Sequence, residues 1–198
     1  MKRFLYGLAL AIGLAGCTAF EQSDPREAVV RIEMAGGVCT GFYINHGGMI
    51  ATAGHCVTKG DKVKVYHKDG SVRDATVVAD DDSQDVALIV LDIAERVKYI
   101  PLRCDADLRV GDYVKVIGHP RDIFKWFVSF GHVSGSGKVE GAPDPNIEYI
   151  WLQAPILPGN SGGPVINSWG EAVGVISIGM ASVFNGAVHI KHICKLVG

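Results

Sequence analysis

The sequence lacks any long cluster of basic residues. Its 198 residues carry 19 Lys and Arg against 21 Asp and Glu, which gives a formal net charge of −2 at pH 7. Nucleic acids are bound mainly through clustered positive charge, so this balance argues against a nucleic-acid partner. Lys62 and Lys64 lie close together, but they alternate with Val63 and Val65 and therefore predict the solvent-facing side of a β-strand.

Long apolar runs are also missing. After the basic start Met1-Lys2-Arg3, the apolar stretch from Phe4 to Leu14 is too short to cross a bilayer as a stable helix. Small residues follow this stretch. The arrangement is typical of a secretory signal peptide, which we assign to residues 1–16.

The end of this signal, Leu14-Ala15-Gly16-Cys17, resembles the lipobox of bacterial lipoproteins. In that class the cysteine becomes the lipidated N-terminus, so the resemblance implies that Cys17 carries lipid and that residues 17–28 form a flexible tether. The mature protein is then expected in the cell envelope, lipid-anchored to a bacterial membrane and facing the periplasm or the exterior. A plain signal peptide with an incidental cysteine is the alternative.

Helical periodicity is scarce, whereas glycine is frequent, with 25 residues. Short β-branched runs recur between turn signals, a spacing that predicts antiparallel β-structure. A connection is expected between Ile93 and Arg109, and a short closing helix from about Lys191. The expected strands are 29–32, 41–44, 49–52, 63–66, 75–79 and 87–91, followed by 113–117, 127–134, 149–153, 164–166, 172–178 and 187–190.

No C-x-x-C motif and no Cys/His pair at ligand spacing is present, so we expect no zinc site and no cofactor. With Cys17 assigned to lipid, four of the five cysteines remain: Cys39, Cys56, Cys104 and Cys194. An even number in an exported protein favours disulfides. The residues alone leave all three pairings open.

The most informative stretch is Pro158-Gly159-Asn160-Ser161-Gly162-Gly163-Pro164, because small residues surround one hydroxyl. A serine hydroxyl is a weak nucleophile at its own pKa and needs a histidine base, with a further group to orient that base. His55 is the next-to-last residue of the stretch Ala51-Thr52-Ala53-Gly54-His55-Cys56, and Asp85 directly precedes an apolar run. Both are candidates for these roles.

Together the three motifs resemble those of the trypsin-like serine proteases, in which His, Asp and Ser follow one another in this order. The resemblance runs from about Val29 to the C-terminus. It is closest to the HtrA-like bacterial branch, through Gln153-Ala154, residues 109–112 and residues 116–120.

This family resemblance implies an all-β, chymotrypsin-like fold for residues 29–198. Two six-stranded antiparallel barrels, at about 29–100 and about 109–198, and a short C-terminal helix are expected. The implied activity is that of a serine endopeptidase acting on polypeptide substrates. Many HtrA-like proteases carry a PDZ domain after the protease, and we expect none here because the chain ends soon after the last protease element.

The resemblance also implies a role for each site residue. His55 is expected to be general base toward Ser161 and then general acid toward the leaving amine, while Asp85 orients the ring. One of the acids at 80–82 is the alternative orienting group, but only Asp85 directly precedes an apolar strand. The backbone N–H groups of three consecutive residues are expected to form the oxyanion hole: Gly159, Asn160 and Ser161.

Two further expectations follow from the resemblance. Trypsin-like enzymes commonly join the strand before the catalytic histidine to the cysteine after it, which pairs Cys39 with Cys56 and leaves Cys104 with Cys194. In digestive members an Asp directly before the nucleophile pairs with a newly cut N-terminal amine, whereas this chain has the neutral Asn160. We therefore expect no activation by N-terminal cleavage.

Substrate preference depends on the residues around the nucleophile. Six positions before Ser161, where trypsin has its acidic specificity residue, this chain has Pro155. We therefore expect cleavage after small or medium aliphatic residues rather than after Lys or Arg, with strand 175–179 pairing with the substrate backbone. The predicted substrate-binding residues are Ile156, Ser177, Ile178, Gly179 and Ala187.

Four aromatic residues cluster between the expected strands of the second series: Phe124, Trp126, Phe127 and Phe130. Packing in the core is expected for them in preference to exposed contact with a membrane or a partner. HtrA-like trimers usually make their contacts near the N-terminus, where this chain offers little apolar material. A monomer is therefore expected in preference to a trimer.

Two rival functions remain. Gly159-x-Ser161-x-Gly163 also fits the nucleophile elbow of α/β-hydrolases, with Glu171 and either His189 or His192 completing an esterase triad. That fold needs long helices between its strands, and none is indicated after Ser161. The other rival is a protease homologue that binds peptides without cleaving them, although all three triad positions are occupied.

Overall fold

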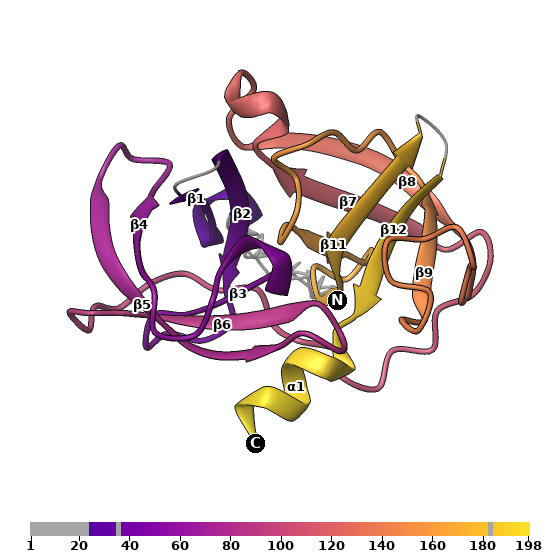
Figure 1. Cartoon of the computed structure of the whole chain (residues 1–198). Coiled ribbons are helices and arrows are strands. Elements are labelled where there is room, and N and C mark those ends of the chain that lie inside the picture. Colours follow the sequence, from indigo (N-terminus) through magenta and orange to yellow (C-terminus); the bar gives the residue numbers. More distant parts are fainter. Residues whose placement is uncertain (1–23, 35–36, 182–183) are drawn as a thin grey trace, which may run out of the picture.

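Twelve strands close into two antiparallel barrels in the part of the chain that the computed structural model describes, residues 24–34, 37–181 and 184–198. Figure 1 shows the two barrels side by side, with the C-terminal helix below them. The expected all-β fold of two six-stranded barrels with a short closing helix is confirmed.

Barrel one is built from the first half of the chain, with strands in the order β1-β2-β3-β6-β5-β4. Alternation along β4 confirms the pattern expected there: Val63 and Val65 are buried, whereas Lys62 and Lys64 are exposed. Strand β4 thus turns one face to the barrel interior and the other to solvent. The strands are β1 (Val29–Met34), β2 (Gly37–Tyr43), β3 (Met49–Thr52), β4 (Lys62–Tyr66), β5 (Val72–Asp81) and β6 (Val86–Leu91).

Barrel two has the strand order β10-β11-β12-β9-β8-β7. Closure leaves neither barrel with an open sheet edge, so every strand has a hydrogen-bonded neighbour on both sides. The strands are β7 (Tyr113–Gly118), β8 (Phe127–Gly137), β9 (Tyr149–Gln153), β10 (Pro164–Ile166), β11 (Ala172–Ala181) and β12 (Phe184–His189).

The two barrels share one apolar contact region. Phe42 on β2 belongs to the same buried cluster as Ile117 on β7 and Val175 on β11. Helix α1 (Lys191–Val197) leaves barrel two and packs against β5 and β6 of barrel one, where Ile193 is fully buried. These contacts fix the two barrels, and the loops between them, relative to each other.

Both disulfides of the expected pairing are present. Cys39 on β2 is joined to Cys56, and Cys104 in the connection between the barrels is joined to Cys194 on α1. The pairs are 17 and 90 residues apart in sequence. In the chain-entropy model, loops of these sizes contribute about 3 and about 4–5 kcal/mol to stability.

The last residues of the expected tether, 17–28, form regular structure instead of a flexible segment. Pro25–Ala28 form the 3₁₀-helix η1, in which the Asp24 side chain accepts the backbone N–H of Arg26 at 3.0 Å and Ala28 is buried. An N-terminal cap and a proline at the first helical position favour this short helix. Cys17 and the predicted signal peptide lie outside the described residues. Within the described residues, we find no helix with the length and apolar character needed to cross a membrane.

The aromatic cluster differs from expectation. Phe124, Phe127 and Phe130 are 55%, 47% and 57% exposed, so the expectation of core packing is wrong for these three. Phe124 lies in the loop between β7 and β8, whereas Phe130 alternates with the buried Ser129 and Gly131 and so faces outward. Only Trp126 is half-buried, and its Nε1–H donates to the carbonyl oxygen of Val29 at 2.7 Å.

Candidate active site

His55 lies on the 3₁₀-helix η2 (Gly54–Cys56), directly after β3. The Cys39–Cys56 disulfide ties the next residue to β2, and the backbone N–H of His55 donates to Asp85 Oδ1 at 2.7 Å. A short helix, a covalent bond and a hydrogen bond therefore fix the position of the ring. The side chain itself is 47% exposed, which leaves it accessible to a substrate.

Asp85 lies directly before β6, and its carboxylate accepts a hydrogen bond from the His55 ring. Nδ1 of His55 is 3.0 Å from both carboxylate oxygens, and the carboxylate is only 13% exposed. Because an ionised carboxylate only accepts, Nδ1 carries the proton and Nε2 is free to accept another. The hydrogen bond that His55 donates to Asp85 raises the pKa of His55, and burial opposes part of this effect. Asp85 has a φ of +52°, a strained backbone of the kind found at functional sites.

Ser177 makes a contact that the sequence did not predict. Its hydroxyl, on β11 of barrel two, donates to Asp85 Oδ2 in barrel one. Ser177 is only 3% exposed, so this side chain points at the carboxylate and away from solvent. The side chain therefore holds Asp85 in position. The assignment of Ser177 to substrate binding stays a prediction, and Ser177 also lines the cavity beside His55. Only the alternation of a polar residue between Ile176 and Ile178 could have signalled a special position.

The acids at 80–82 have other partners or none near the ring. Asp80 accepts the backbone N–H of Lys59, and Asp81 accepts both donors of Ser83. Asp82 is exposed and lines the rim of a cavity of about 350 Å³ beside His55. The same cavity is lined by Pro143, Asp144, Ile147, Tyr149, Ser177 and Ile178.

The loop carrying Ser161 enters between the two barrels. Thr40 of β2 donates its backbone N–H to the carbonyl oxygen of Ser161 at 2.8 Å, and Gly162 N–H donates to the carbonyl oxygen of Ile176 at 2.7 Å. Gly162 has a φ of +82°, and a Cβ there would collide with the Thr40 carbonyl and with the Thr52 hydroxyl. Thr52 ends β3, three residues before His55, so the nucleophile candidate is packed against the segment that carries the base.

Between the described side chains of His55 and Ser161 the structure has no hydrogen bond. Catalytic hydrogen bonds are often long in unliganded enzymes and shorten when substrate binds.

Two backbone N–H groups beside Ser161 remain available. Asn160 N–H donates to the carbonyl oxygen of Leu157 at 3.0 Å, which leaves Gly159 and Ser161 as the two donors of the expected oxyanion hole; neither donates to a backbone carbonyl of the described residues. Gly159 has a φ of +99°, and a Cβ there would collide with the His119 carbonyl oxygen. Glycine is therefore required at this position.

A buried network lies behind this loop. The Thr40 hydroxyl donates to the carbonyl oxygen of Gly159 at 2.7 Å, so the 3.0 Å contact with His119 must be a donation from Nδ1–H to the Thr40 hydroxyl. Burial lowers the pKa of His119 to about 4, and the ring is therefore neutral near pH 7. Its Nε2 has no hydrogen-bond partner among the described residues.

One buried polar residue close to the predicted substrate-binding residues was not singled out by the sequence. Asn185 on β12 is fully buried, and its Nδ2 donates to the Ala154 carbonyl oxygen at 2.6 Å. This donation fixes the amide orientation and leaves Oδ1 without a partner among the described residues. Oδ1 lies 3.3 Å from the position that a Cβ would take on Gly179, and Ile156 Cγ2 lies 3.8 Å from the same position.

The other predicted pocket residues differ in exposure. Ile156 is 7% exposed and Ala187 is fully buried, whereas Gly179 is exposed. On the β11–β12 ladder, Gly179 pairs with Asn185 and Ile178 pairs with Gly186. Ile156, Ile178 and Ala187 are apolar, and the amide of Asn185 is a polar group close to Gly179.

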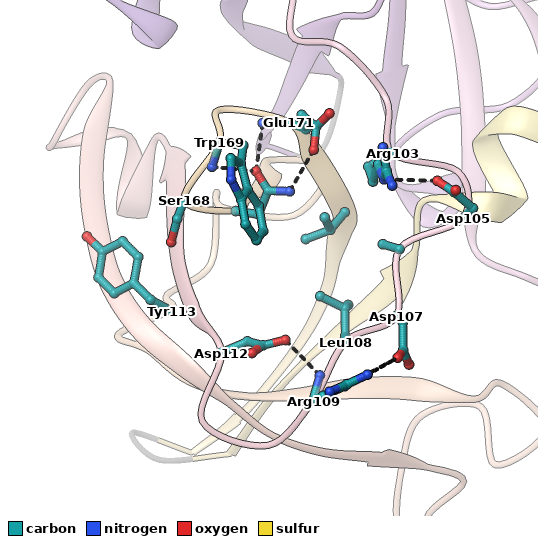
Figure 2. A pocket seen from close by; sticks show the side chains of 13 residues that line it. Arg103, Asp105, Asp107, Leu108, Arg109, Asp112, Tyr113, Ser168, Trp169 and Glu171 are labelled. Atoms are coloured by element: carbon teal, nitrogen blue, oxygen red, sulfur yellow. Dashed lines mark hydrogen bonds and ion pairs between the residues drawn. The ribbon is translucent and has the colours of Figure 1, made fainter.

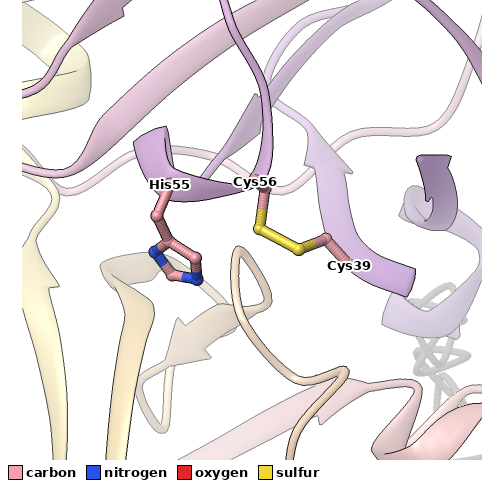
Figure 3. Close-up of side chains that lie close together, drawn as sticks. All are labelled: Cys39, His55 and Cys56. Atoms are coloured by element: carbon pink, nitrogen blue, oxygen red, sulfur yellow. A yellow bond between two sulfur atoms is a disulfide. The ribbon is translucent and has the colours of Figure 1, made fainter. Parts of the chain in front are cut away.

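Cys39, His55 and Cys56 form a group of potential metal ligands whose ligand atoms lie within 4.8 Å of one another. Figure 3 shows the two sulfur atoms joined to each other beside the His55 ring. A disulfide sulfur is not a thiolate, and the thiolate is the form that binds metal. We therefore interpret this group as a structural disulfide beside the His55 ring and not as a metal site.

A larger cavity, of about 620 Å³, is lined by residues from 103–113 and 167–173 (Figure 2). Its two arginines are paired with two of its four acidic side chains: Arg103 with Asp105 and Arg109 with Asp107, both at 2.9 Å. The exposed Trp169 borders it. None of His55, Asp85 or Ser161 lines this cavity, so catalytic chemistry is assigned to the barrel junction.

The esterase alternative finds no support in these contacts. Glu171 accepts from the Asn167 side chain within the β10–β11 turn, and the His189 ring is bonded to the Ala106 carbonyl oxygen. Neither contact involves the Ser161 loop. Helix α1 has only seven residues and is the only α-helix among the described residues, whereas an α/β-hydrolase needs long helices between its strands.

Comparison with known proteins gives a consistent result. The family model described as a trypsin-like peptidase domain matches residues 39–175. "Serine protease HTRA1A" of Danio rerio is 35% identical over 159 residues, covering 79% of this chain and 33% of that protein. "Putative serine protease HhoA" of Synechocystis is 34% identical, with 70% and 36% covered.

A third relative covers a similar share of this chain. The "Probable periplasmic serine endoprotease DegP-like" of Rhizobium meliloti is 34% identical over 136 residues, covering 69% of this chain and 27% of that protein. The chain spans about a third of the length of the curated relatives it matches.

Proposed function

The chain belongs to the trypsin-like peptidase family, in its HtrA-type group, and on this premise we propose that it is a serine endopeptidase whose triad is His55, Asp85 and Ser161. One observation carries the proposal. Nδ1 of His55 is hydrogen-bonded to a nearly buried carboxylate, beside a loop that presents one serine hydroxyl and two free backbone N–H groups.

The proposed reaction follows from these positions. Ser161 Oγ attacks the scissile carbonyl carbon while Nε2 of His55 takes its proton, and Asp85 stays ionised and stabilises the imidazolium. The oxyanion accepts hydrogen bonds from the N–H groups of Gly159 and Ser161. His55 then donates its proton to the leaving amine, and the resulting acyl ester on Ser161 is hydrolysed by a water that His55 activates.

Labelling with a fluorophosphonate probe tests this function. Such probes form a covalent bond only with an activated serine, so the wild-type protein should be labelled and Ser161→Ala should not be. His55→Ala should slow labelling at least about a thousandfold, because the hydroxyl then has no base. A folded wild-type protein that stays unlabelled would instead support the non-catalytic peptide binder.

We propose that substrates are extended polypeptides cleaved after small or medium aliphatic residues, and that Asn185 adds a preference for threonine. Valine and threonine have nearly the same shape, but only the threonine hydroxyl can donate to the partnerless Oδ1 of Asn185. Satisfying a buried acceptor is typically worth about 1–3 kcal/mol. Pro155 leaves the pocket without a charge to attract Lys or Arg.

Peptides that differ only in the residue before the scissile bond measure this preference. Threonine should exceed valine several-fold in kcat/KM, and Asn185→Leu should remove or reverse that ratio. Comparing two substrates on one variant cancels any loss of folded protein. A profile dominated by Arg or Lys would contradict the proposal for the pocket.

We further propose that the mature protein is held at a bacterial membrane by lipid on Cys17 and acts as a monomer. The support is the lipobox-like Leu14-Ala15-Gly16-Cys17 after a basic and apolar start. Cells fed an alkyne-tagged palmitate should incorporate the tag into the wild-type protein and not into Cys17→Ser. The fluorophosphonate-labelled protein should be found in the membrane fraction.

A further inference from the structure

One oxyanion donor depends on the loop between β7 and β8. The backbone N–H of Arg121, in that loop, donates to the carbonyl oxygen of Pro158 at 2.6 Å. Across a trans peptide the C=O and the following N–H point in opposite directions, so holding the Pro158 oxygen also fixes where the Gly159 N–H points. The Thr40 hydroxyl holds the other side of the same residue through the Gly159 carbonyl oxygen.

This loop does not favour its own conformation. Arg121, Asp122 and Trp126 have φ values of +55°, +55° and +51°, a region that residues other than glycine seldom adopt. Strained backbone of this kind persists only when the surrounding structure determines it. Contacts from outside the loop must therefore supply the stabilisation.

The outside contacts come from β1 of barrel one. Nε and Nη2 of Arg31 donate to the two carboxylate oxygens of Asp122 at 2.6 and 2.9 Å. The Trp126 Nε1–H donates to the Val29 carbonyl oxygen at 2.7 Å, and the Trp126 ring packs edge-on against His119. We name the ion pair and the Trp126–Val29 hydrogen bond together the β1 latch.

Arg31 is held in place for this contact. Its side chain is only 11% exposed, its guanidinium lies 4.8 Å from the centre of the Tyr66 ring, and Nη1 also donates to Glu33 at 3.0 Å. The hydrogen bond to Asp122 raises the pKa of Arg31, and the guanidinium in turn lowers the pKa of Asp122. Both groups are therefore charged near pH 7, and a two-pronged pair of this kind is directional as well as strong.

We propose that Arg31 is a positioning residue that keeps the Gly159 N–H in the oxyanion hole by holding the 119–126 loop through Asp122. This proposal rests on the proposed peptidase function. In this chain Asn160 has no charge, so an N-terminal amine cannot stabilise the oxyanion hole by an ion pair with it. The proposal assigns that stabilisation to β1 of barrel one instead.

Steady-state kinetics on Arg31→Met test the latch. Methionine keeps most of the apolar stem but cannot form the ion pair. We expect kcat to fall about tenfold with KM within about twofold, because the oxyanion forms only in the transition state. Binding of a peptidyl aldehyde, which forms an oxyanion on Ser161, should weaken by the same factor. Lys64→Met is the matched control, since Lys64 pairs with Asp74 at 3.0 Å on the outer face of the same barrel and should leave kcat unchanged.

A double-mutant cycle separates the pair from a general loss of stability. Asp122→Asn should also lower kcat about tenfold, and Arg31→Met with Asp122→Asn together should lose no more than either alone. Independent effects would instead multiply to about a hundredfold loss, which would overturn the proposal. A loss of kcat that is matched by a fall in the fraction of folded protein would also overturn it.

Hydrogen exchange gives a readout that does not require activity. The amides of 119–126 and 158–161 should exchange about tenfold faster in Arg31→Met than in the wild type, while those of β6 stay unchanged. Unchanged exchange in 158–161 would reject the latch even in an active enzyme. If the wild type is not labelled by fluorophosphonate but the exchange result holds, the peptidase function fails and the latch stands as a structural coupling.

Discussion

Replacing Asp85 with asparagine is expected to lower kcat by about four orders of magnitude without unfolding the protein. The two side chains have the same shape, but the amide has no charge to stabilise the imidazolium that forms on His55. Both carboxylate oxygens of Asp85 now accept hydrogen bonds, from the His55 ring and backbone and from Ser177. An asparagine NH₂ group must therefore face a donor on one side.

The position of that NH₂ group explains the size of the effect. Placed near Nδ1 of His55, it favours the tautomer in which Nδ1 accepts and Nε2 carries the proton. Nε2 can then no longer take the Ser161 proton. Loss of the charge and loss of the correct tautomer therefore act together.

The pH profile of the same variant has a predictable sign. The hydrogen bond to Asp85 raises the pKa of His55 in the wild type. Catalysis needs the neutral ring, so this shift moves the acidic limb of kcat/KM to higher pH. Asp85→Asn should move the limb to lower pH in the residual activity, measured between about pH 4 and 9.

Asp82→Asn is the matched control for this prediction. Asp82 lines the same cavity beside His55 but is exposed. Its replacement removes one negative charge from the same neighbourhood and should change kcat less than about twofold. Equal losses in Asp82→Asn and Asp85→Asn would mean that general electrostatics, and not the ring contact, supports catalysis.

Gly159→Ala is expected to lower kcat by about 10²–10³ because it displaces one oxyanion donor. A Cβ on this residue would collide with the His119 carbonyl oxygen, and the φ of +99° is unfavourable for alanine. Relief of the collision has to rotate or shift the Pro158–Gly159 peptide, which is the peptide that carries the donor. Burst-phase kinetics should show that acylation is the step that slows.

Gly111→Ala separates this effect from backbone strain alone. Gly111 has a similar φ of +93° in barrel two, but a Cβ there meets no atom within 4 Å. Its replacement should cost about 1 kcal/mol of stability and leave kcat unchanged. The assignment of Gly159 fails if Gly159→Ala retains wild-type kcat at full folding.

Much of the architecture could be predicted from local patterns. Strand alternation, such as Lys62 and Lys64 exposed against Val63 and Val65 buried, depends only on the two-residue period of a strand. The C-terminal helix was likewise predicted from a short local stretch of sequence, from about Lys191. The twelve expected strand positions correspond to β1–β12, with ends that differ by a few residues.

The misses concern contacts between residues far apart in the sequence. The exposure of Phe124, Phe127 and Phe130 depends on which side of β8 and its loop faces the other barrel. The amino-acid composition does not predict which side that is. The tether prediction missed η1 because Ala28 is buried only by residues that fold back against it. In each case the deciding neighbour lies elsewhere in the chain.

The sequence by itself determined the fold class and which residue types are available for catalysis: a serine among glycines, a histidine beside a cysteine, and an acid before an apolar strand. Only the tertiary structure decided how they are supported: Ser177 of barrel two on Asp85 of barrel one, Asn185 beneath the pocket, and Arg31 on Asp122 across 91 residues. The physical reason is one of range. Strand periodicity and turn chemistry act between near neighbours, whereas hydrogen-bond direction across two packed barrels exists only after both barrels have closed.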